Sequence, residues 1–444
     1  MATTASRPAA ATRAQGWTNW AGDQSCRPAE IVAPRNREDL AEAVGRAAEA
    51  GGPVHVAGSG HSFTEAALTD GAMLRLEALD RLLDADRESG LVRVESGIAL
   101  SRLNDQLWSL GLALENLGDI DTQTLAGAIS TGTHGTGAKL RNISAQVEAI
   151  ELVTADGSVR ELTADAHPDL LRAARVGLGA LGAISAVTLR CVPAFVLDRV
   201  DAPRPTDEVL DTFQERAEQH DHYEFFTFPY ADTALVLERN RTDEQPRPRG
   251  RAAAFVNDIV LENWALDALS RTGRRFNRTI PGLARFAAKL ASGSHAVDRS
   301  YRIFANERRV RFTEMEYGVP RESGPEAARR VIDWVRSNQY PVFFPIEMRV
   351  VAADDALLSP SHERDTCYIA VHQYNGMEWR PYFEAVESIM NEFGGRPHWG
   401  KRHFQTHETL PQRYPRWGDF LAARDQLDPG RVFRNPYTER VLGP

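Results

Sequence analysis

The chain has 444 residues, 42% of them hydrophobic and 25% charged. This is the balance of a soluble globular protein large enough for two or three lobes. The formal net charge of -9 argues against a nucleic-acid partner, because phosphate binding needs a basic surface. The apolar runs fall far short of the roughly 20 residues that cross a bilayer, so we expect no membrane span. Three scattered cysteines predict neither a disulfide framework nor a zinc site, and we expect a cytoplasmic protein without a bound metal.

Residues 1–20 are predicted to be a disordered tail, because their start lacks acidic residues and the apolar block of a secretory signal. The first lobe is expected over residues 21–194. It opens with a strand at 30–34, a helix at 37–50 and a strand at 53–58, with Asn36 as a suitable helix N-cap. Residues 147–162 predict a hairpin that turns at 155–157, and residues 183–192 predict a closing strand.

Two glycine-rich segments of this lobe can approach a ligand closely. Residues 58–62, Gly-Ser-Gly-His-Ser, come directly after a strand, where glycines let backbone N–H groups turn inward around a phosphate. Residues 124–137 interleave four glycines with hydroxyl side chains. Each segment alone could be an ordinary polar loop. Together they favour a long ligand with phosphates in its middle.

A third glycine pattern, at residues 177–182, matches G-x-G-x-x-G but stands in the wrong context. A dinucleotide motif follows a strand and opens a helix, whose N-terminus then faces the pyrophosphate. Here a helical stretch at 168–175 precedes the glycines and a strand-like run follows them. We therefore interpret the pattern as close packing of the chain near a cofactor and not as an NAD site.

The second lobe is expected over residues 195–410, as an α+β layer in which an antiparallel sheet is backed by helices. Strands are predicted at 311–319, 342–352 and 367–374, and helices at 325–337 and 380–393.

Four polar residues on two of these strands form a candidate active site. Side chains two apart on a strand share a face, so Glu347 and Arg349 point the same way, as do His372 and Tyr374. A solvated polar face with a surface ion pair is the alternative. Lys401, in a turn with His398, could stabilise negative charge on a substrate oxygen.

In order and spacing these motifs resemble the vanillyl-alcohol-oxidase type of FAD-binding fold. The motifs are residues 58–62, 124–137 and 177–185, the Glu347-x-Arg349 pair and the His398-Trp-Gly-Lys401 turn. Within that fold the chain is similar to the aldonolactone oxidoreductases over nearly its whole length, and most similar to the bacterial L-gulono-1,4-lactone dehydrogenases. The resemblance implies a two-lobed FAD-binding domain, an α+β substrate (cap) domain with an antiparallel sheet, and a C-terminal segment, 411–444, that returns to the FAD-binding domain.

The resemblance also implies roles for individual residues. His61 would carry FAD covalently. The cofactor would be bound by Val56, Ala57, Gly58, Ser59, Gly60, His61, Ser62, Gly127, Ser130, Gly132, Thr133, His134, Gly135, Thr136 and Ile184. Glu347, Arg349 and Lys401 would be catalytic, and Thr124, His372 and Tyr374 would bind substrate.

The implied reaction is hydride transfer from C2 of an aldono-1,4-lactone to the flavin, giving an ascorbate-type product. An alditol oxidase acting on xylitol or sorbitol, and a non-catalytic FAD- or sugar-binding protein, are the alternatives. Oxygen and a cytochrome- or quinone-type molecule both stay open as electron acceptor.

Overall fold

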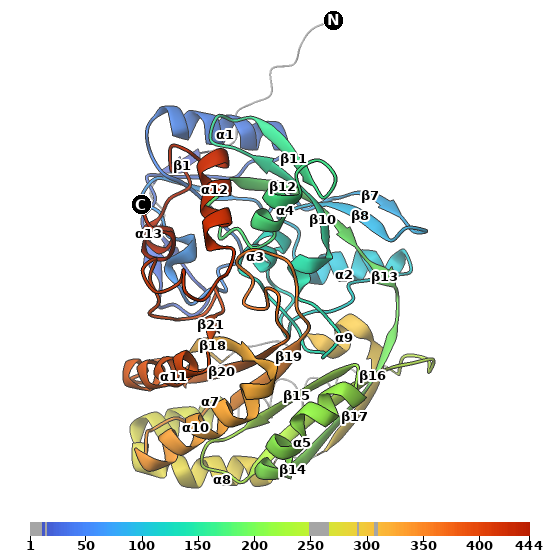
Figure 1. The fold of residues 1–444 in the computed structure, drawn as a ribbon, viewed down its shortest axis with the longest axis vertical. Coiled ribbons are helices and arrows are strands. Elements are labelled where there is room, and N and C mark those ends of the chain that lie inside the picture. Colours follow the sequence, from blue (N-terminus) through green and yellow to red (C-terminus); the bar gives the residue numbers. More distant parts are fainter. Residues whose placement is uncertain (1–10, 14–15, 248–265, 291–292, 306–309) are drawn as a thin grey trace, which may run out of the picture.

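The computed structural model describes residues 11–13, 16–247, 266–290, 293–305 and 310–444. Figure 1 shows two lobes, one built on small sheets and the other on a single wide sheet. Among the described residues, no helix is both long and apolar enough to cross a bilayer.

The first lobe contains two principal sheets. One has the strand order β1-β4-β6-β5, in which β6 pairs in parallel with both β4 and β5. The other is antiparallel, with the order β11-β10-β12-β8-β7. The strands of the lobe are β1 (Ala11–Arg13), β2 (Trp17–Thr18), β3 (Ser25–Cys26), β4 (Glu30–Val32), β5 (Val54–Ala57), β6 (Ala72–Arg75), β7 (Leu82–Asp86), β8 (Leu91–Glu95), β9 (Leu112–Ala113), β10 (Val147–Val153), β11 (Val159–Thr163), β12 (Ala183–Arg190) and β13 (Val192–Pro193).

The helices of this lobe follow the sequence signals closely. The Asn36 side chain accepts a hydrogen bond from the Asp39 N–H at 2.7 Å and caps the first helix, as predicted. The helices are α1 (Arg37–Glu49), η1 (Glu65–Ala67), α2 (Leu100–Ser109), α3 (Leu125–Ser130), η2 (Ile143–Gln146) and α4 (Pro168–Arg175). Helix α3 occupies part of the second glycine-rich segment, which sequence reasoning had treated wholly as a loop.

The second lobe is an eight-stranded sheet with the order β17-β14-β16-β15-β19-β20-β18-β21, and every strand pair in it is antiparallel. Its strands are β14 (Val196–Pro205), β15 (His222–Thr227), β16 (Thr233–Thr242), β17 (Ser294–Arg299), β18 (Phe312–Pro320), β19 (Ile346–Val351), β20 (Thr366–Tyr374) and β21 (Arg396–Pro397). Its helices are α5 (Thr206–Gln219), α7 (Leu266–Arg275), η4 (Asn277–Thr279), α8 (Ile280–Leu290), α9 (Ser300–Phe304), η5 (Arg321–Ser323), α10 (Gly324–Ser337) and α11 (Arg380–Glu392).

The two faces of this sheet have opposite character. Helices α5, α10 and α11 bury apolar side chains against one face, where Met315, Met348 and Ile369 are fully enclosed. Because side chains alternate along a strand, the neighbours of these residues point to the other face. Those neighbours include Glu314, Glu347 and other ionisable residues, so the sheet presents charged groups toward the first lobe.

The C-terminal segment contains α12 (Trp417–Leu427) and α13 (Pro436–Leu442). Trp417, Phe420 and Tyr437 belong to the same hydrophobic core as α2 and β10 of the first lobe. Figure 1 shows both helices beside the first lobe, so the C-terminal segment packs on that lobe.

The described residues of the predicted tail, 11–13 and 16–20, include two short strands. Strand β1 pairs with β4, β2 pairs with β3, and Trp17 is buried. The indole of Trp17 packs with Ala57 and Met73, which explains why this polar-flanked segment is ordered. Residues 1–10 and 14–15 lie outside the described part.

Candidate active site

A cleft of about 940 Å³ runs through the first lobe. The loop after β5, helix α3 and the turn between α4 and β12 form its walls. Eleven of the residues predicted to bind cofactor or substrate line it: Val56, Ala57, Gly58, Ser59, Gly60, His61, Ser62, Thr124, Gly127, Ser130 and Ile184. Leu178, Gly179 and Gly182 of the misleading G-x-G-x-x-G pattern also line it, after a helix and before a strand as predicted.

The glycines of this cleft stand where a side chain would not fit. A Cβ on Gly58 would lie 2.6 Å from the Thr124 hydroxyl oxygen, and a Cβ on Gly97 only 1.8 Å from the Leu76 carbonyl oxygen. Gly60 has φ of +74°, a conformation that L side chains rarely adopt. The bare backbone is therefore required here, as expected of a wall against which a long ligand lies.

Thr124, which was predicted to bind substrate, is the N-cap residue of helix α3. Its hydroxyl accepts a hydrogen bond from the Gly127 N–H at 3.3 Å and caps α3. It lines the cleft of the first lobe. The capping bond engages the Thr124 hydroxyl within the first lobe, and the prediction that Thr124 contacts substrate stays a prediction.

A second cleft, of about 1080 Å³, continues from the first. His61, Ser62, Gln123 and Thr131 line both. The charged face of the wide sheet forms the other side of this second cleft. The residues on that side are Phe312, Glu314, Glu316, Phe344, Pro345, Glu347, Arg349 and His372.

His61 lies at the junction of the two clefts. Its ring stacks on Trp20 with centroids 5.5 Å apart, and its Nε2 lies 2.9 Å from the Thr122 hydroxyl. Burial and the nearby Lys401 ammonium lower the pKa of His61 to about 4. The imidazole is therefore neutral at pH 7, the state in which a ring nitrogen can bond to carbon.

The buried amide oxygen Oε1 of Gln123, at the same junction, has no hydrogen-bond partner among the described residues. A buried acceptor without a donor is costly, and a bound ligand that brings an N–H or O–H group removes that cost. The junction therefore has room and an open acceptor for part of a ligand.

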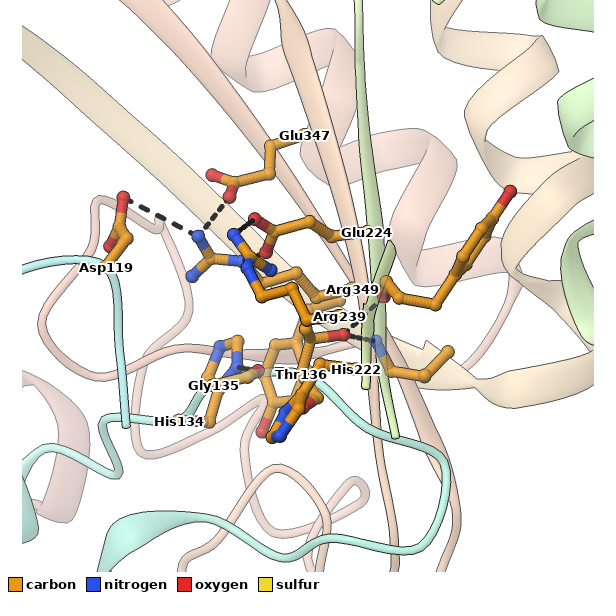
Figure 2. Close-up of polar contacts among 12 residues, drawn as sticks. Asp119, His134, Gly135, Thr136, His222, Glu224, Arg239, Glu347 and Arg349 are labelled. Carbon is orange, nitrogen blue, oxygen red and sulfur yellow. Dashed lines mark hydrogen bonds and ion pairs between the residues drawn. The ribbon is translucent and has the colours of Figure 1, made fainter. Parts of the chain in front are cut away.

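Arg349 is held in the second cleft by three carboxylates. Its Nε donates to Glu224 Oε2 at 2.8 Å, and its Nη2 pairs with Glu347 and lies 3.5 Å from Asp119 Oδ2. Arg239 donates to the other Glu224 oxygen at 2.7 Å. Figure 2 shows this arrangement, with the Arg349 guanidinium between Asp119, Glu347 and Glu224, and with Arg239 beside Glu224 as well. Burial alone would lower the pKa of Arg349, but Glu347, Glu224 and Asp119 together raise it well above its usual value.

Lys401 is the second cation of this cleft. Its Nζ lies 2.5 Å from Glu314 Oε2, and its side chain is 23% exposed against 6% for Glu314. Burial would lower the pKa of Lys401, whereas Glu314 and Glu316 raise it, and the net shift is upward. The ammonium is therefore charged at neutral pH and reaches the cleft.

Glu316, His134 and His398 form a third cluster of ionisable side chains in this cleft. His134 Nε2 lies 3.1 Å from Glu316 Oε1, and the imidazole of His134 stacks on Tyr368 with centroids 3.6 Å apart. Ligand atoms of His134, Glu316 and His398 lie within 4.8 Å of one another, so the geometry alone would admit a metal ion. His134 Nδ1, however, lies 2.8 Å from the Gly135 carbonyl oxygen, and His398 Nδ1 accepts the Gly400 N–H at 3.0 Å. Polar contacts within the protein already engage these rings, and the prediction of no metal site stays a prediction.

Two other predicted cofactor residues, Thr133 and His134, line the second cleft. Gly132, Gly135 and Thr136 line neither cleft. A Cβ on Gly135 would lie 2.2 Å from Asn116 Oδ1, and the Thr136 hydroxyl donates to the Tyr223 carbonyl at 2.6 Å. These three positions pack the segment against its neighbours, and the structure does not support direct cofactor contact by them.

The two residues of β20 that were predicted to bind substrate, His372 and Tyr374, differ in their position relative to the second cleft. His372 lines the second cleft, but Tyr374 does not. The Tyr374 hydroxyl donates to Asp267 Oδ1 at 2.7 Å, and its ring stacks with that of Phe344, which itself lines the cleft. The two residues share a face as predicted, but the strand carries Tyr374 past the end of the cleft, so its predicted role in substrate binding is not supported.

Several residues of the site were missed from the sequence: Asp119, Gln123, Glu224, Glu314 and Glu316. Glu314-Met315-Glu316 alternates as Glu347-Met348-Arg349 does, and this signal could have placed both glutamates on the polar face. Glu224 gave no such signal, because only the register of β15 with β19 brings it opposite Arg349.

Sequence and fold comparisons agree on the class of protein. Residues 28–163 match the FAD binding domain family. A solvent-stable cholesterol oxidase has the same fold, with a TM-score of 0.84 at 20% identity over 96% of this chain and 97% of that one. The chain therefore has the FAD-binding fold of the vanillyl-alcohol-oxidase type. The first cleft, whose wall contains Gly58, Gly60 and Gly97, fits FAD.

Residues 187–441 match the D-arabinono-1,4-lactone oxidase family, and the chain belongs to that family. It is 51% identical to L-gulono-1,4-lactone dehydrogenase of Mycobacterium tuberculosis over 96% of this chain and 99% of that protein. It is 34% identical to mouse L-gulonolactone oxidase, over 96% and 97% of the two chains. An alditol oxidase of Streptomyces is 32% identical, over 96% and 98%.

Proposed function

We propose that this chain is an FAD-dependent oxidoreductase that oxidises an aldono-1,4-lactone, such as L-gulono-1,4-lactone, at C2. The 2-keto product would enolise to an ascorbate-type species. One observation carries the proposal: a polar cleft with two carboxylate-bound cations, Arg349 and Lys401, is continuous with the glycine-walled cofactor cleft at His61. The 51% identity to a lactone dehydrogenase over nearly the whole chain supports it.

Residues 56–62 would wrap the pyrophosphate of FAD, because their backbone lies along the cofactor cleft with no side chain in the way at Gly58 and Gly60. His61 would be covalently bonded to the isoalloxazine ring. Its neutral imidazole and its place between the clefts support that bond. When bound, FAD accepts the hydride that leaves the carbinol carbon.

The protein's own groups would orient the substrate and stabilise charge. Arg349 and Lys401 would stabilise the negative charge that develops on the carbinol oxygen, since both are held as cations at the cleft wall. Glu347 is paired with Arg349, which favours a role in holding the guanidinium over one as proton acceptor. His372 would contact a substrate hydroxyl.

The charges of this cleft already pair with one another. Arg349 is paired with Glu224 and Glu347, Lys401 with Glu314, and Glu316 with His134. A charged substrate would have to displace one of these buried pairs, which is costly. A neutral polyhydroxylated molecule needs only hydrogen bonds, and this favours the closed lactone over the aldonate formed by its hydrolysis.

Anaerobic mixing of the purified flavoprotein with substrate tests the proposal directly. Rapid bleaching of the flavin by L-gulono-1,4-lactone, and much slower bleaching by xylitol, is the expected result. An alditol oxidase would give the reverse order, and this alternative is retained because an alditol oxidase is 32% identical to the chain. A non-catalytic FAD- or sugar-binding protein would show no bleaching with either compound.

Two finer proposals have their own measurements. Acid precipitation should leave the yellow colour in the pellet of the wild type and release it to the supernatant in His61→Ala, because only a covalent bond survives unfolding. Parallel assays of oxygen consumption and cytochrome c reduction, with the same lactone, distinguish an oxidase from a dehydrogenase.

A further inference from the structure

His372 lines the second cleft, and its contact with a carbonyl oxygen determines which ring nitrogen carries the proton. It lies on β20 with 8% of its surface exposed, and its ring packs edge-on against Phe312 with centroids 5.2 Å apart. Its Nδ1 lies 3.1 Å from the Pro345 carbonyl oxygen. A carbonyl oxygen only accepts, so Nδ1 must carry a proton. In the neutral ring the lone pair then resides on Nε2.

The partner of Nε2 is Glu314, but the contact is loose. Glu314 Oε1 lies 3.6 Å from Nε2, which is beyond hydrogen-bond length. The other Glu314 oxygen is 2.5 Å from the Lys401 ammonium, so that oxygen is already engaged in an ion pair. Glu314 therefore leaves the Nε2 lone pair available, yet stands close enough to stabilise a positive charge that arrives on the ring.

The other bases around the cleft are occupied. Lys401 and Arg349 keep their protons, because neighbouring carboxylates raise the pKa of each. Glu347 and Asp119 lie against the Arg349 guanidinium, and a carboxylate beside a guanidinium is a weak base. None of these four groups is suited to take a proton from an alcohol.

The remaining histidines that line the cleft are also committed, and one of them, His61, is assigned to the flavin bond. His398 uses Nδ1 to accept the Gly400 N–H, and burial lowers its pKa to about 3. Both nitrogens of His134 face acceptors, the Gly135 carbonyl and Glu316. Burial would raise the pKa of Glu316, but His134, His398 and Lys401 together lower it, so that carboxylate is a weak base as well.

We propose that His372 is the general base of the reaction, an inference that rests on the proposed function. Its Nε2 takes the proton of the C2 hydroxyl as that O–H bond breaks. The C2–H bond breaks with both electrons, which leave as hydride to the bound flavin, and the oxygen keeps the O–H pair to form the carbonyl. The imidazolium is then stabilised by Glu314, while Pro345 fixes the ring orientation through Nδ1.

His372→Asn is the sharpest test, since the Asn amide can still donate to the Pro345 carbonyl but has no basic nitrogen. The first-order rate of flavin reduction should fall at least about a hundredfold, the usual contribution of a general base. Tyr374→Phe is the matched control, because Tyr374 lies two residues further along the strand and outside the cleft. That control should keep the wild-type rate and flavin content.

Chemical rescue separates a base from a positioning residue. In His372→Gly, added imidazole should restore flavin reduction in proportion to its concentration, and no rescue combined with a near-normal rate in His372→Asn would overturn the proposal. Nitrogen-15 NMR of the holoprotein, with the His372 signal identified by its loss in His372→Asn, should show the proton on Nδ1. A neutral ring with its proton on Nε2 would also overturn it. If the wild type is not bleached by any lactone, the proposed function fails instead, and the NMR result still reports on the ring.

Discussion

Arg239 offers the most demanding test of how the site is supported. Its guanidinium is 3% exposed, and it shares Glu224, which is 4% exposed, with the cleft residue Arg349. Burial alone would raise the pKa of Glu224, but Arg239 and Arg349 lower it from 4.5 to about 2. At about 1.4 kcal/mol for each pKa unit, the ionised carboxylate contributes about 3 kcal/mol to folding at pH 7. Arg239→Met removes the larger of the two attractions and should cost about that much.

Urea unfolding followed by tryptophan fluorescence measures this cost. The matched control is Arg330→Met, which breaks an exposed pair with Glu392 and should leave the midpoint unchanged. Because the folded pKa of Glu224 is depressed, its contribution is complete above pH 4.5 and is lost as the pH falls toward 2. About 1 kcal/mol of it should be gone by pH 4. An effect of Arg239→Met no larger than that of the control, or one fully additive with Glu224→Gln, would refute this account.

Three further predictions concern the clefts. Arg349→Met and Lys401→Met should each slow flavin reduction at least about tenfold with flavin content retained, as measured by anaerobic stopped flow, and near-normal rates would remove their assigned roles. Glu314→Gln removes the main group that raises the pKa of Lys401, so the rate of flavin reduction should decline at a lower alkaline pH than in the wild type, and an unchanged pH profile would contradict the pairing. Gly58→Ala should lower the flavin-to-protein absorbance ratio, because its Cβ would meet the Thr124 hydroxyl, whereas Gly52→Ala meets nothing within 4 Å and should not.

Local signals in the sequence were enough for most of the fold. The Asn36 cap, the turn at 155–157 and the alternation around Met348 each rest on neighbours in the chain, and the structure has the expected helix, hairpin and core side chain. Helix α3 was missed because a helix of six residues is too short to show a periodic pattern. The burial of Trp17, inside the predicted tail, was missed for a similar reason, since it depends on Ala57 and Met73 far along the chain.

Site residues could be predicted from the sequence only where polar and apolar side chains alternate along a strand. Glu347 and Arg349 could be placed on one face by counting. The length of the cleft could not be predicted, and so Tyr374 was grouped with residues of a cleft that it does not line. Gly135 and Thr136 look like ligand-binding residues in sequence, yet Asn116 and Tyr223 occupy their contacts in space. Such competition between a ligand and distant packing partners leaves no mark in a single sequence.

The register of the wide sheet explains why the cations need this particular fold. Glu224 stands opposite Arg349 in the β15–β19 pair, and Glu314 stands opposite His372 in the β18–β20 pair. A shift of either register by one residue would turn the carboxylate into the apolar face and leave a buried cation without its partner. Helices α5, α10 and α11 make that shift costly, because they enclose Met315 and Met348 on the opposite face. The hydrophobic core of the second lobe therefore determines where Arg349, His372 and Lys401 meet the cofactor cleft of the first.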